Sequence, residues 1–546
     1  MIRKADPDLP QQQNNTTANN VVKGGILLFA ESIFIRSFDF LTGILLLRFL
    51  GPTDYGIYTI GLSIVMLATM FTGQAETNLE RFIPQWQAEQ RFGSVRRLFL
   101  VVSTVNLVLA SAVILVIWIL SGWLAQYFQI SALESVIKLL LVLVLSNNFA
   151  NTASYTLMGL FAYRLRVTLL LLRSVTYLVY TAVILWVGAT LVGVIFGFTL
   201  LSLLFASIIY GITGKTLWKT TAQITIENEP TPFLQILSTV VHYALPLSGG
   251  YTLHMVYNRM GTLLSGFLFG PAAAAYFGLA MMIYETVTQA LVSLFRALLA
   301  TMSHLWGTGQ QVQAVQLFIH SFRYATVCGG VFSSLLILSA RPLILLLGGD
   351  TYLPAVILLQ ILAVQLIIRL PYEVITVIYY LNQLTWRILG YNLVKTGVDF
   401  LGYVLFIPLL GLTGAATAHI FSYVAALFIY MFRLPVLPNF GVSMMTKMII
   451  RTLVLFPVIV IPLFYAQLYI INGSWFNSAL MIVLVPVLWI TGGAVSGLIT
   501  PFDADQLKQV TLPIVWTNRV KDILLETMRY YLTWIIQITP VKLKTL

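Results

Sequence analysis

The chain has 546 residues, of which 59% are hydrophobic and only 9% are charged, and its mean hydropathy is +0.89. Soluble domains carry roughly 25% charged residues, so this composition excludes a soluble enzyme or binding domain and predicts a helical membrane protein. The net charge of +12 would suit a nucleic-acid-binding protein, but the basic residues are scattered through short loops between apolar runs. Membrane topology explains that distribution, and we expect no nucleic-acid partner.

The first 23 residues are polar and include the run QQQNNTTANN, which predicts a disordered cytoplasmic tail at residues 1–23. Apolar runs follow, each close to the roughly 20 residues that a helix needs to cross hydrocarbon. By this length criterion we expect an all-α polytopic membrane protein with about fourteen transmembrane helices. The expected spans lie near residues 25–47, 56–75, 98–120, 134–158, 167–188, 191–213, 236–257, 261–300, 324–347, 354–380, 388–410, 411–433, 448–471 and 476–498.

Two Gly-Pro pairs indicate an internal repeat. Gly51-Pro52 follows the first expected span and Gly270-Pro271 follows the seventh, and each pair leads into a helix that opens with small and aromatic residues. A weaker echo relates residues 187–193 to residues 410–416. Because about six spans separate the two members of each pair, both halves have the same orientation. The repeat predicts two six-helix lobes related by a pseudo-two-fold axis along the membrane normal.

The repeat and the polar stretches together predict six segments. The polar stretches separate the lobes from each other and from the last helices, and the tail has an amphipathic pattern. In chain order we expect the disordered tail at 1–23, an N-lobe with helices 1–6 at 24–213, a cytoplasmic linker at 214–235, a C-lobe with helices 7–12 at 236–433, a final helix pair at 434–500 and an amphipathic cytoplasmic tail at 501–546.

The basic residues predict the topology. With the N-terminus inside, most loop Lys and Arg fall on the inner side, and the outer loops hold little beyond Arg48, Lys138, Arg259 and Arg341. Both termini are therefore expected to be cytoplasmic, in the cytoplasmic membrane. The inner loop at 76–97 carries an apolar stripe that ends at Trp86, which predicts a short helix lying in the membrane interface.

The first span contains three ionisable residues, Glu31, Arg36 and Asp39. Each costs several kcal/mol at membrane depth, so each marks a candidate site. In one interpretation Arg36 meets an anionic substrate while Glu31 or Asp39 exchanges ions with the gradient that drives transport. In the other, Arg36 and Asp39 pair at i, i+3 and neutralise each other within the bundle.

The eighth span carries Glu285 and Arg296, which lie near the same helix face at about 100° per residue. We interpret this polar stripe as a lining of the transport pathway, with Glu285 a candidate for ion coupling and Arg296 a candidate for substrate binding.

Two further spans hold opposite charges at i, i+4. Arg369 and Glu373 lie in the tenth span, and Lys395 and Asp399 lie in the eleventh. Such pairs neutralise each other in the simplest interpretation. In the alternative, the two cations, Arg369 and Lys395, face an anionic headgroup.

No motif points to a cofactor, a metal or covalent chemistry. The sequence lacks a phosphate-binding GxxxxGK[ST] loop, HExxH and GxSxG, and Cys328 is its single cysteine. We therefore expect a protein that is not an enzyme, takes no cofactor and draws its energy from an ion gradient or from product removal.

Several short motifs resemble those of a known family. The run LRFLGPTDYGIY at residues 47–58 resembles the first-loop signature of polysaccharide and oligosaccharide flippases, a branch of the multidrug/oligosaccharidyl-lipid/polysaccharide exporter superfamily. An acidic residue that is common near the end of the family's seventh helix is replaced here by Asn258. The other matching motifs are RFIP at 81–84, RRL at 96–98, FGP at 269–271 and LGLTGAA at 410–416.

The resemblance implies a transporter that flips a lipid-linked oligosaccharide of the undecaprenyl-pyrophosphate type across the cytoplasmic membrane by alternating access. Its partners would be that lipid-linked oligosaccharide, the membrane lipids, and the glycan polymerase and glycosyltransferases of cell-surface polysaccharide biosynthesis. The same superfamily contains cation-coupled multidrug antiporters, which remain an alternative. A membrane glycan polymerase or ligase is a third, although such enzymes usually need a large outer loop and none is apparent here.

Overall fold

The computed structural model describes residues 10–72, 74–222, 231–382, 384–433, 442–469 and 475–499, and short helical stretches between 525 and 533. The side chains of residues 10–33, 468–469 and 475–479, and of several single positions in other helices, lie outside this description. The described chain is helical throughout, and it divides into two compact units, Met1–Gly278 and Leu279–Leu546.

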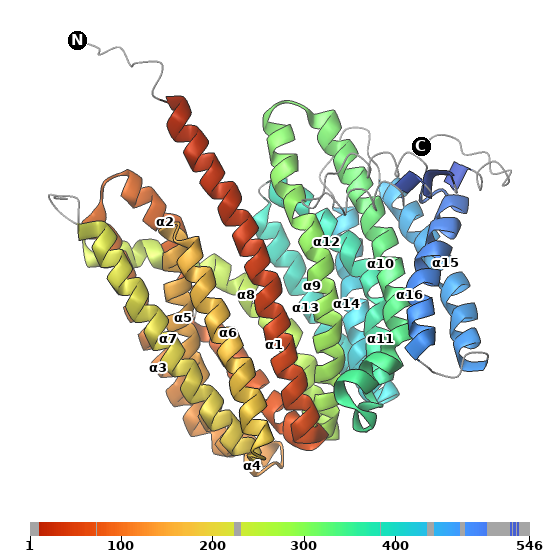
Figure 1. The fold of residues 1–546 in the computed structure, drawn as a ribbon, viewed down its shortest axis with the longest axis horizontal. Coiled ribbons are helices and arrows are strands. Elements are labelled where there is room, and N and C mark those ends of the chain that lie inside the picture. Colours follow the sequence, from red (N-terminus) through yellow and green to blue (C-terminus); the bar gives the residue numbers. More distant parts are fainter. Residues whose placement is uncertain are drawn as a thin grey trace. The chain divides into compact units, whose positions relative to one another are not determined.

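Among the residues that the structure describes, the first unit contains eight α-helices and the beginning of a ninth (Figure 1). They are α1 (Pro10–Ala68), the 3-10 turn η1 (Thr69–Thr72), α2 (Thr77–Ala88), α3 (Phe92–Tyr127), α4 (Ala132–Leu140), α5 (Val142–Gly159), α6 (Tyr163–Trp186), α7 (Leu191–Ala222), α8 (Phe233–Phe269) and α9 (Pro271–Gly307). The second unit contains the rest of α9, α10 (Gln311–Gly348), the 3-10 turn η2 (Asp350–Tyr352), α11 (Ala355–Val364), α12 (Leu366–Leu381), α13 (Thr385–Leu410), α14 (Leu412–Phe432), α15 (Val442–Tyr469) and α16 (Trp475–Val495).

Many of these helices match a membrane in length and composition. In the described part of the chain nine helices are long and apolar enough to cross a bilayer, and the bent pair α11–α12 makes a tenth. The all-helical membrane class expected from composition is therefore confirmed. The helix α1 begins at Pro10, inside the segment expected to be a disordered tail, because a helix nucleated in an apolar span extends outward at one hydrogen bond per residue.

The two Gly-Pro pairs have nearly the same backbone conformation. Gly51 interrupts α1 with φ 72° and ψ 174°, and Gly270 separates α8 from α9 with φ 87° and ψ 176°. These positive φ values favour glycine, and the following proline suits the first turn of the next helix. The local break that the repeated motif predicts is thus present at both positions.

The two breaks also lie against each other within the first unit. Gly56, one turn after Pro52, packs so closely on Pro271 that a Cβ atom at Gly56 would collide with the Pro271 carbonyl group. A Cβ atom at Gly266 would likewise lie too close to the side chains of Ile60 and Ala274. Small residues allow helix backbones to approach closely where no hydrophobic force drives association. Gly56 therefore holds the two repeated turns together.

The helix expected at 76–97 is present as α2, but the surroundings of its apolar stripe differ from the expectation. Leu79, Ile83 and Trp86 are buried in a core with residues of α3, α7 and α8. The apolar stripe therefore packs on neighbouring helices and not on lipid, while the position of α2 at the membrane interface stays a prediction. An i, i+3, i+4, i+7 stripe packs equally well on protein or on lipid, so the pattern alone does not distinguish the two.

In the second unit the final helix pair packs on α10. The Trp489 ring of α16 is fully buried, and it occupies the space that a side chain at Gly330 would fill. Its indole N–H donates a hydrogen bond to Ser334 Oγ at 3.0 Å. Gln467 of α15 donates a hydrogen bond to the carbonyl oxygen of Leu338, which also lies in α10, at 3.0 Å. The pair is therefore fixed to the second unit by polar contacts as well as by apolar packing.

The helices α13 and α14 form a tight antiparallel hairpin around Gly411, whose φ is 62°. A Cβ atom at Gly414 would collide with the Phe406 carbonyl group, and one at Gly402 would lie 2.8 Å from Ala418 Cβ. This close approach encloses the polar residues that the two helices place between them.

Candidate functional site

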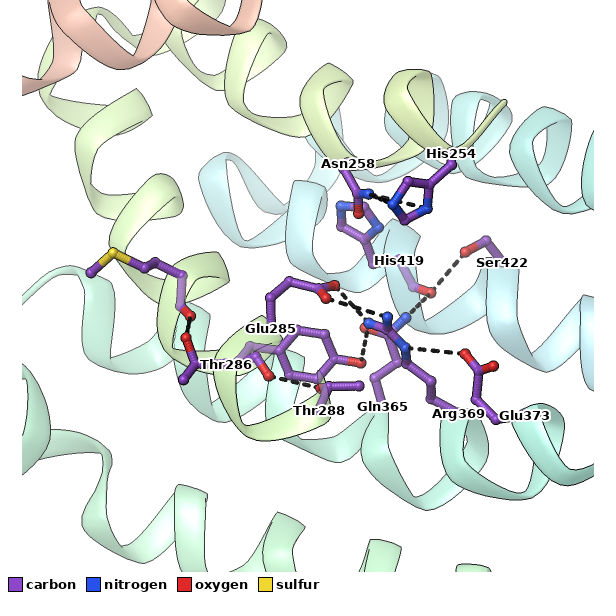
Figure 2. Close-up of polar contacts among 12 residues, drawn as sticks. His254, Asn258, Glu285, Thr286, Thr288, Gln365, Arg369, Glu373, His419 and Ser422 are labelled. Carbon is purple, nitrogen blue, oxygen red and sulfur yellow. Dashed lines mark hydrogen bonds and ion pairs between the residues drawn. The ribbon is translucent and has the colours of Figure 1, made fainter. Parts of the chain in front are cut away.

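In the second unit, several ionisable residues lie close to Arg369 of α12, and Figure 2 shows Glu285 and Glu373 on either side of it. Its side chain is only 5% exposed, and its guanidinium group forms an ion pair with Glu285 of α9 through two hydrogen bonds. One joins Nη1 to Oε1 at 2.6 Å and the other joins Nη2 to Oε2 at 3.3 Å. Tyr284 adds its hydroxyl, 3.4 Å from Nη1. Charge-assisted pairs of this bidentate kind are the strongest hydrogen bonds that side chains form.

A second carboxylate lies on the same helix as Arg369. Glu373 Oε1 is 3.8 Å from Arg369 Nε, one helical turn away. The Glu285 and Glu373 side chains are 25% and 27% exposed, so both are more accessible than the arginine between them. Both carboxylates can therefore exchange protons or ions more readily than Arg369 can leave its site.

Tyrosine rings enclose the cations. The Arg369 guanidinium carbon lies 5.5 Å from the Tyr284 ring centre and 5.3 Å from that of Tyr423. Lys395 of α13 places its Nζ 4.1 Å from the Tyr423 ring centre. It also interacts electrostatically with Arg369 and with Glu373. Ring faces stabilise cations without neutralising them, so the positive charges keep the capacity to attract an anion.

The hairpin of α13 and α14 holds a buried polar group next to these charges. His419 Nδ1 lies 3.4 Å from Asp399 Oδ1, and His419 Nε2 lies 3.0 Å from the Tyr403 hydroxyl. Asp399 and His419 are both almost completely buried. Gln365, at the bend between α11 and α12, donates to the His419 carbonyl oxygen at 3.1 Å. A hydrogen bond thus connects the bend between α11 and α12 to the buried His419 of the α13–α14 hairpin.

The cluster has closely balanced charges. Three carboxylates, those of Glu285, Glu373 and Asp399, face the basic side chains of Arg369 and Lys395 and one histidine. Protonating one carboxylate therefore removes one negative charge from the surroundings of Arg369 and Lys395. An arrangement of this kind can exchange a proton or a small cation against an anionic group.

The structure brings together three of the residues that the sequence proposed as sites. Arg369, Lys395 and Glu285 belong to one cluster in the second unit. Arg36 and Asp39 lie in the first unit on α1, with exposed side chains that interact electrostatically. Glu31 and Arg296 lie outside the residues whose side chains are described.

The surroundings of Asp39 include residues that the sequence reasoning missed. Ser174 of α6 places its hydroxyl 3.4 Å from Asp39 Oδ1, and Arg173 is close enough to interact with the carboxylate. Arg173 also lies over the Tyr177 ring at 5.7 Å. A positively charged residue in the fifth expected span was a usable signal, because an ionisable side chain there requires a partner.

His419 and Tyr403 were also missed. Asp399 was paired with Lys395 along one helix, whereas its close ion-pair partner lies across the hairpin. The signal was available, because residues at similar distances from a tight turn such as Gly411 face each other in antiparallel helices. Among the residues that the structure describes, no group of three or more His, Cys, Asp or Glu is arranged to hold a metal ion.

Comparison with known protein sequences finds a matching family model. A sequence model of the family described as "Polysaccharide biosynthesis protein" matches residues 45–357, more than half of the chain. No curated protein sequence matches the chain.

The fold is similar to those of several solved transporters. The lipid II flippase MurJ, in an inward closed conformation, has a TM-score of 0.62 at 14% identity, over 86% of this chain and 98% of that one. An inward-facing multidrug resistance MATE transporter of the MOP superfamily has a TM-score of 0.60 at 14% identity, over 75% and 95%. The MATE multidrug transporter DinF-BH has a TM-score of 0.55 at 16% identity, over 79% and 96%. At these identities the similarity establishes the fold alone.

Proposed function

The chain belongs to the polysaccharide biosynthesis protein family, and from this premise we propose that it moves a lipid-linked oligosaccharide across the cytoplasmic membrane by alternating access. The substrate would be of the undecaprenyl-pyrophosphate type, made on the cytoplasmic side and used outside for cell-surface polysaccharide. The family match is the observation that supports this function most directly. Similarity to the fold of a lipid II flippase over 86% of the chain supports it further.

We propose that the membrane topology expected from the sequence is that of such a transporter. We infer about fourteen membrane spans, because Gly51 divides α1 into two and because α8, α9 and α16 are long apolar helices beyond the ten counted above. The expected N-lobe at 24–213 and C-lobe at 236–433, with the linker, final pair and tail between and after them, remain our proposal for the transporting parts. Both termini would be cytoplasmic, and the glycosyltransferases and the polymerase would act before and after transport.

The charge cluster of the second unit suggests how a pyrophosphate headgroup is bound. As the structure stands, Arg369 is held by Glu285 and is almost fully enclosed. An anionic headgroup can replace Glu285 only when that carboxylate has lost its charge. Protonation of Glu285 would therefore free Arg369 for the phosphate, with Lys395 as the second cation. Arg36 and Arg296 remain substrate-binding candidates, and Glu31 and Asp39 remain ion-coupling candidates.

Flipping is tested by the sidedness of the glycan lipid in the host. We expect cells that lack this gene to accumulate lipid-linked oligosaccharide in the cytoplasmic leaflet, because its transport route is missing. The measurement is the accessibility of the oligosaccharide to a lectin in right-side-out and inverted membrane vesicles. Wild-type protein is expected to restore outward exposure, and the Arg369→Ala variant is not.

The multidrug antiporter is the second candidate, and the three carboxylates of the cluster favour it as a site for lipophilic cations. It predicts unchanged glycan lipids in the deleted strain and greater sensitivity to cationic dyes. That result would contradict the flippase function, while stalled glycan lipids with unchanged dye sensitivity would contradict the antiporter.

A further inference from the structure

The first unit contains a buried carboxyl group that has no part in the mechanism above. Glu76 lies where the helical backbone is interrupted between η1, which ends at Thr72, and α2, which begins at Thr77. The residue is only 3% exposed. Breaks in membrane helices are the places where polar groups become available to bind small ions. Glu76 therefore combines burial with a position suited to binding.

The hydrogen-bond partners of Glu76 are neutral. Asn106 of α3 donates from Nδ2 to Glu76 Oε2 at 3.2 Å and also contacts Thr152 Oγ1 of α5 at 3.1 Å. Asn151 of α5 forms a further side-chain hydrogen bond with Glu76. In the described part of the chain, no Lys, Arg or His forms an ion pair with Glu76. Buried carboxylates usually have a cation or a metal as partner, and this one is instead set up to hold a proton.

The amide of Asn106 can adapt to either protonation state of Glu76. Asn106 is 2% exposed, and its Oδ1 is buried without a hydrogen-bond partner among the described residues. Turning the amide by 180° exchanges its oxygen and nitrogen. With an ionised Glu76 the nitrogen donates to the carboxylate. With a protonated Glu76 the turned amide places its oxygen where it accepts from the carboxylic acid and from the Thr152 hydroxyl, so Asn106 has a hydrogen bond to offer either form of Glu76.

The site has a connection to the surface and a defined electrostatic environment. Asn151 is exposed while it is bonded to Glu76, so a proton that enters through the Asn151 amide region reaches the carboxyl group within one side chain. The helices packed around α2 are α3, α5 and α8, all of the first unit (Figure 1). The titratable and charged groups that face this region are Tyr155, Tyr251, Glu80 and Arg166, and Arg166 interacts with Glu80.

We propose that Glu76 is a proton-binding residue of the first unit, with Asn106 as the amide that turns when the proton binds. The carboxylate takes a proton from water to form an O–H bond, and it returns that proton to water when the unit changes conformation. No other bond is made or broken. That this proton drives glycan-lipid transport rests on the function proposed above, whereas the binding of the proton does not.

The proton site is tested on the full-length protein in lipid nanodiscs by infrared difference spectroscopy during a pH titration. We expect a carboxylic acid C=O band that disappears in Glu76→Gln. The band is expected to persist in Glu80→Gln, the matched control, because Glu80 lies nearby on α2 with an exposed side chain. If Glu76→Gln fails to fold, Thr152→Val serves instead, and it should shift the band because it removes a hydrogen-bond partner of Asn106, the amide that contacts Glu76. A band unchanged in Glu76→Gln or in Thr152→Val overturns the proposal.

Transport in proteoliposomes separates this inference from the proposed function. The wild type is expected to flip a fluorescent lipid-linked oligosaccharide faster under an imposed pH gradient, and Glu76→Gln is expected to lose that acceleration. A Glu76-dependent band without transport of any glycan lipid supports the proton site and contradicts the flippase. Transport that responds only to a sodium gradient, with no Glu76 band, supports the flippase and overturns the proton site.

Discussion

Replacing Arg369 by alanine is expected to destabilise the protein by about 3 kcal/mol and to stop transport. Removing one partner of a buried ion pair leaves the other charge uncompensated, which typically costs about 3–5 kcal/mol. The lower end applies because the Glu285 side chain is 25% exposed and water can partly replace the guanidinium. Reversible denaturation of the purified protein in mixed micelles measures the free energy of unfolding.

A double-mutant cycle shows whether the loss belongs to the pair. Arg369→Ala combined with Glu285→Ala is expected to cost less than the two single changes added together, because the double variant has no stranded charge. The control is the exposed pair of Lys138 and Glu134, whose atoms lie 2.5 Å apart with side chains 36% and 42% exposed. That cycle should give less than about 1 kcal/mol of coupling. Strict additivity at Arg369 and Glu285 would contradict the assigned ion pair.

Gly56→Ala is expected to have a similarly large effect through the backbone. Its Cβ atom would overlap the Pro271 carbonyl group, and both belong to helical backbone that cannot give way as a flexible side chain does. Overpacking of this kind costs roughly 1–3 kcal/mol and occasionally more. We expect about 3 kcal/mol, measured as the free energy of unfolding in micelles, together with lower expression.

Gly211→Ala is the matched control for this substitution. Gly211 lies in α7, and a Cβ atom there would meet nothing within 4 Å. Since alanine favours a helix interior over glycine by roughly 0.5–1 kcal/mol, this variant should be as stable as the wild type or slightly more stable. If Gly56→Ala proved equally harmless, the packing of the two Gly-Pro turns against each other would be wrong.

The fold was predictable where the sequence contains residues with special backbone behaviour. Gly51 and Gly270 mark the two breaks because glycine followed by proline is a strong local signal, and the family resemblance carried by those motifs is confirmed by the family match. The bend of 42° between α11 and α12 at Gln365 was not predictable, because no glycine or proline stands at the break. It depends on tertiary contacts such as that between Gln365 and His419.

The candidate site divides in the same way between local and distant contacts. The ion pair of Arg369 with Glu373 follows from an i, i+4 spacing, and the structure contains it at 3.8 Å. The shorter contact between Arg369 and Glu285 joins residues 84 positions apart, and helix periodicity says nothing about which helices are neighbours. The sequence therefore identifies Arg369 and Glu285 as ionisable residues in membrane spans that need partners. Only the packing of α9 against α12 shows that they are partners of each other.

The packing of Trp489 against α10 predicts how a shortened form of the protein would behave. A chain that ended at Arg433 would lack the indole that fills the notch at Gly330 and bonds to Ser334. Gly330 and the Ser334 hydroxyl would then face lipid. A small residue next to a hydroxyl group on a membrane helix forms a surface on which another helix can pack. We expect such a truncated chain to self-associate through α10, and we expect the last two helices to prevent that association in the full-length protein.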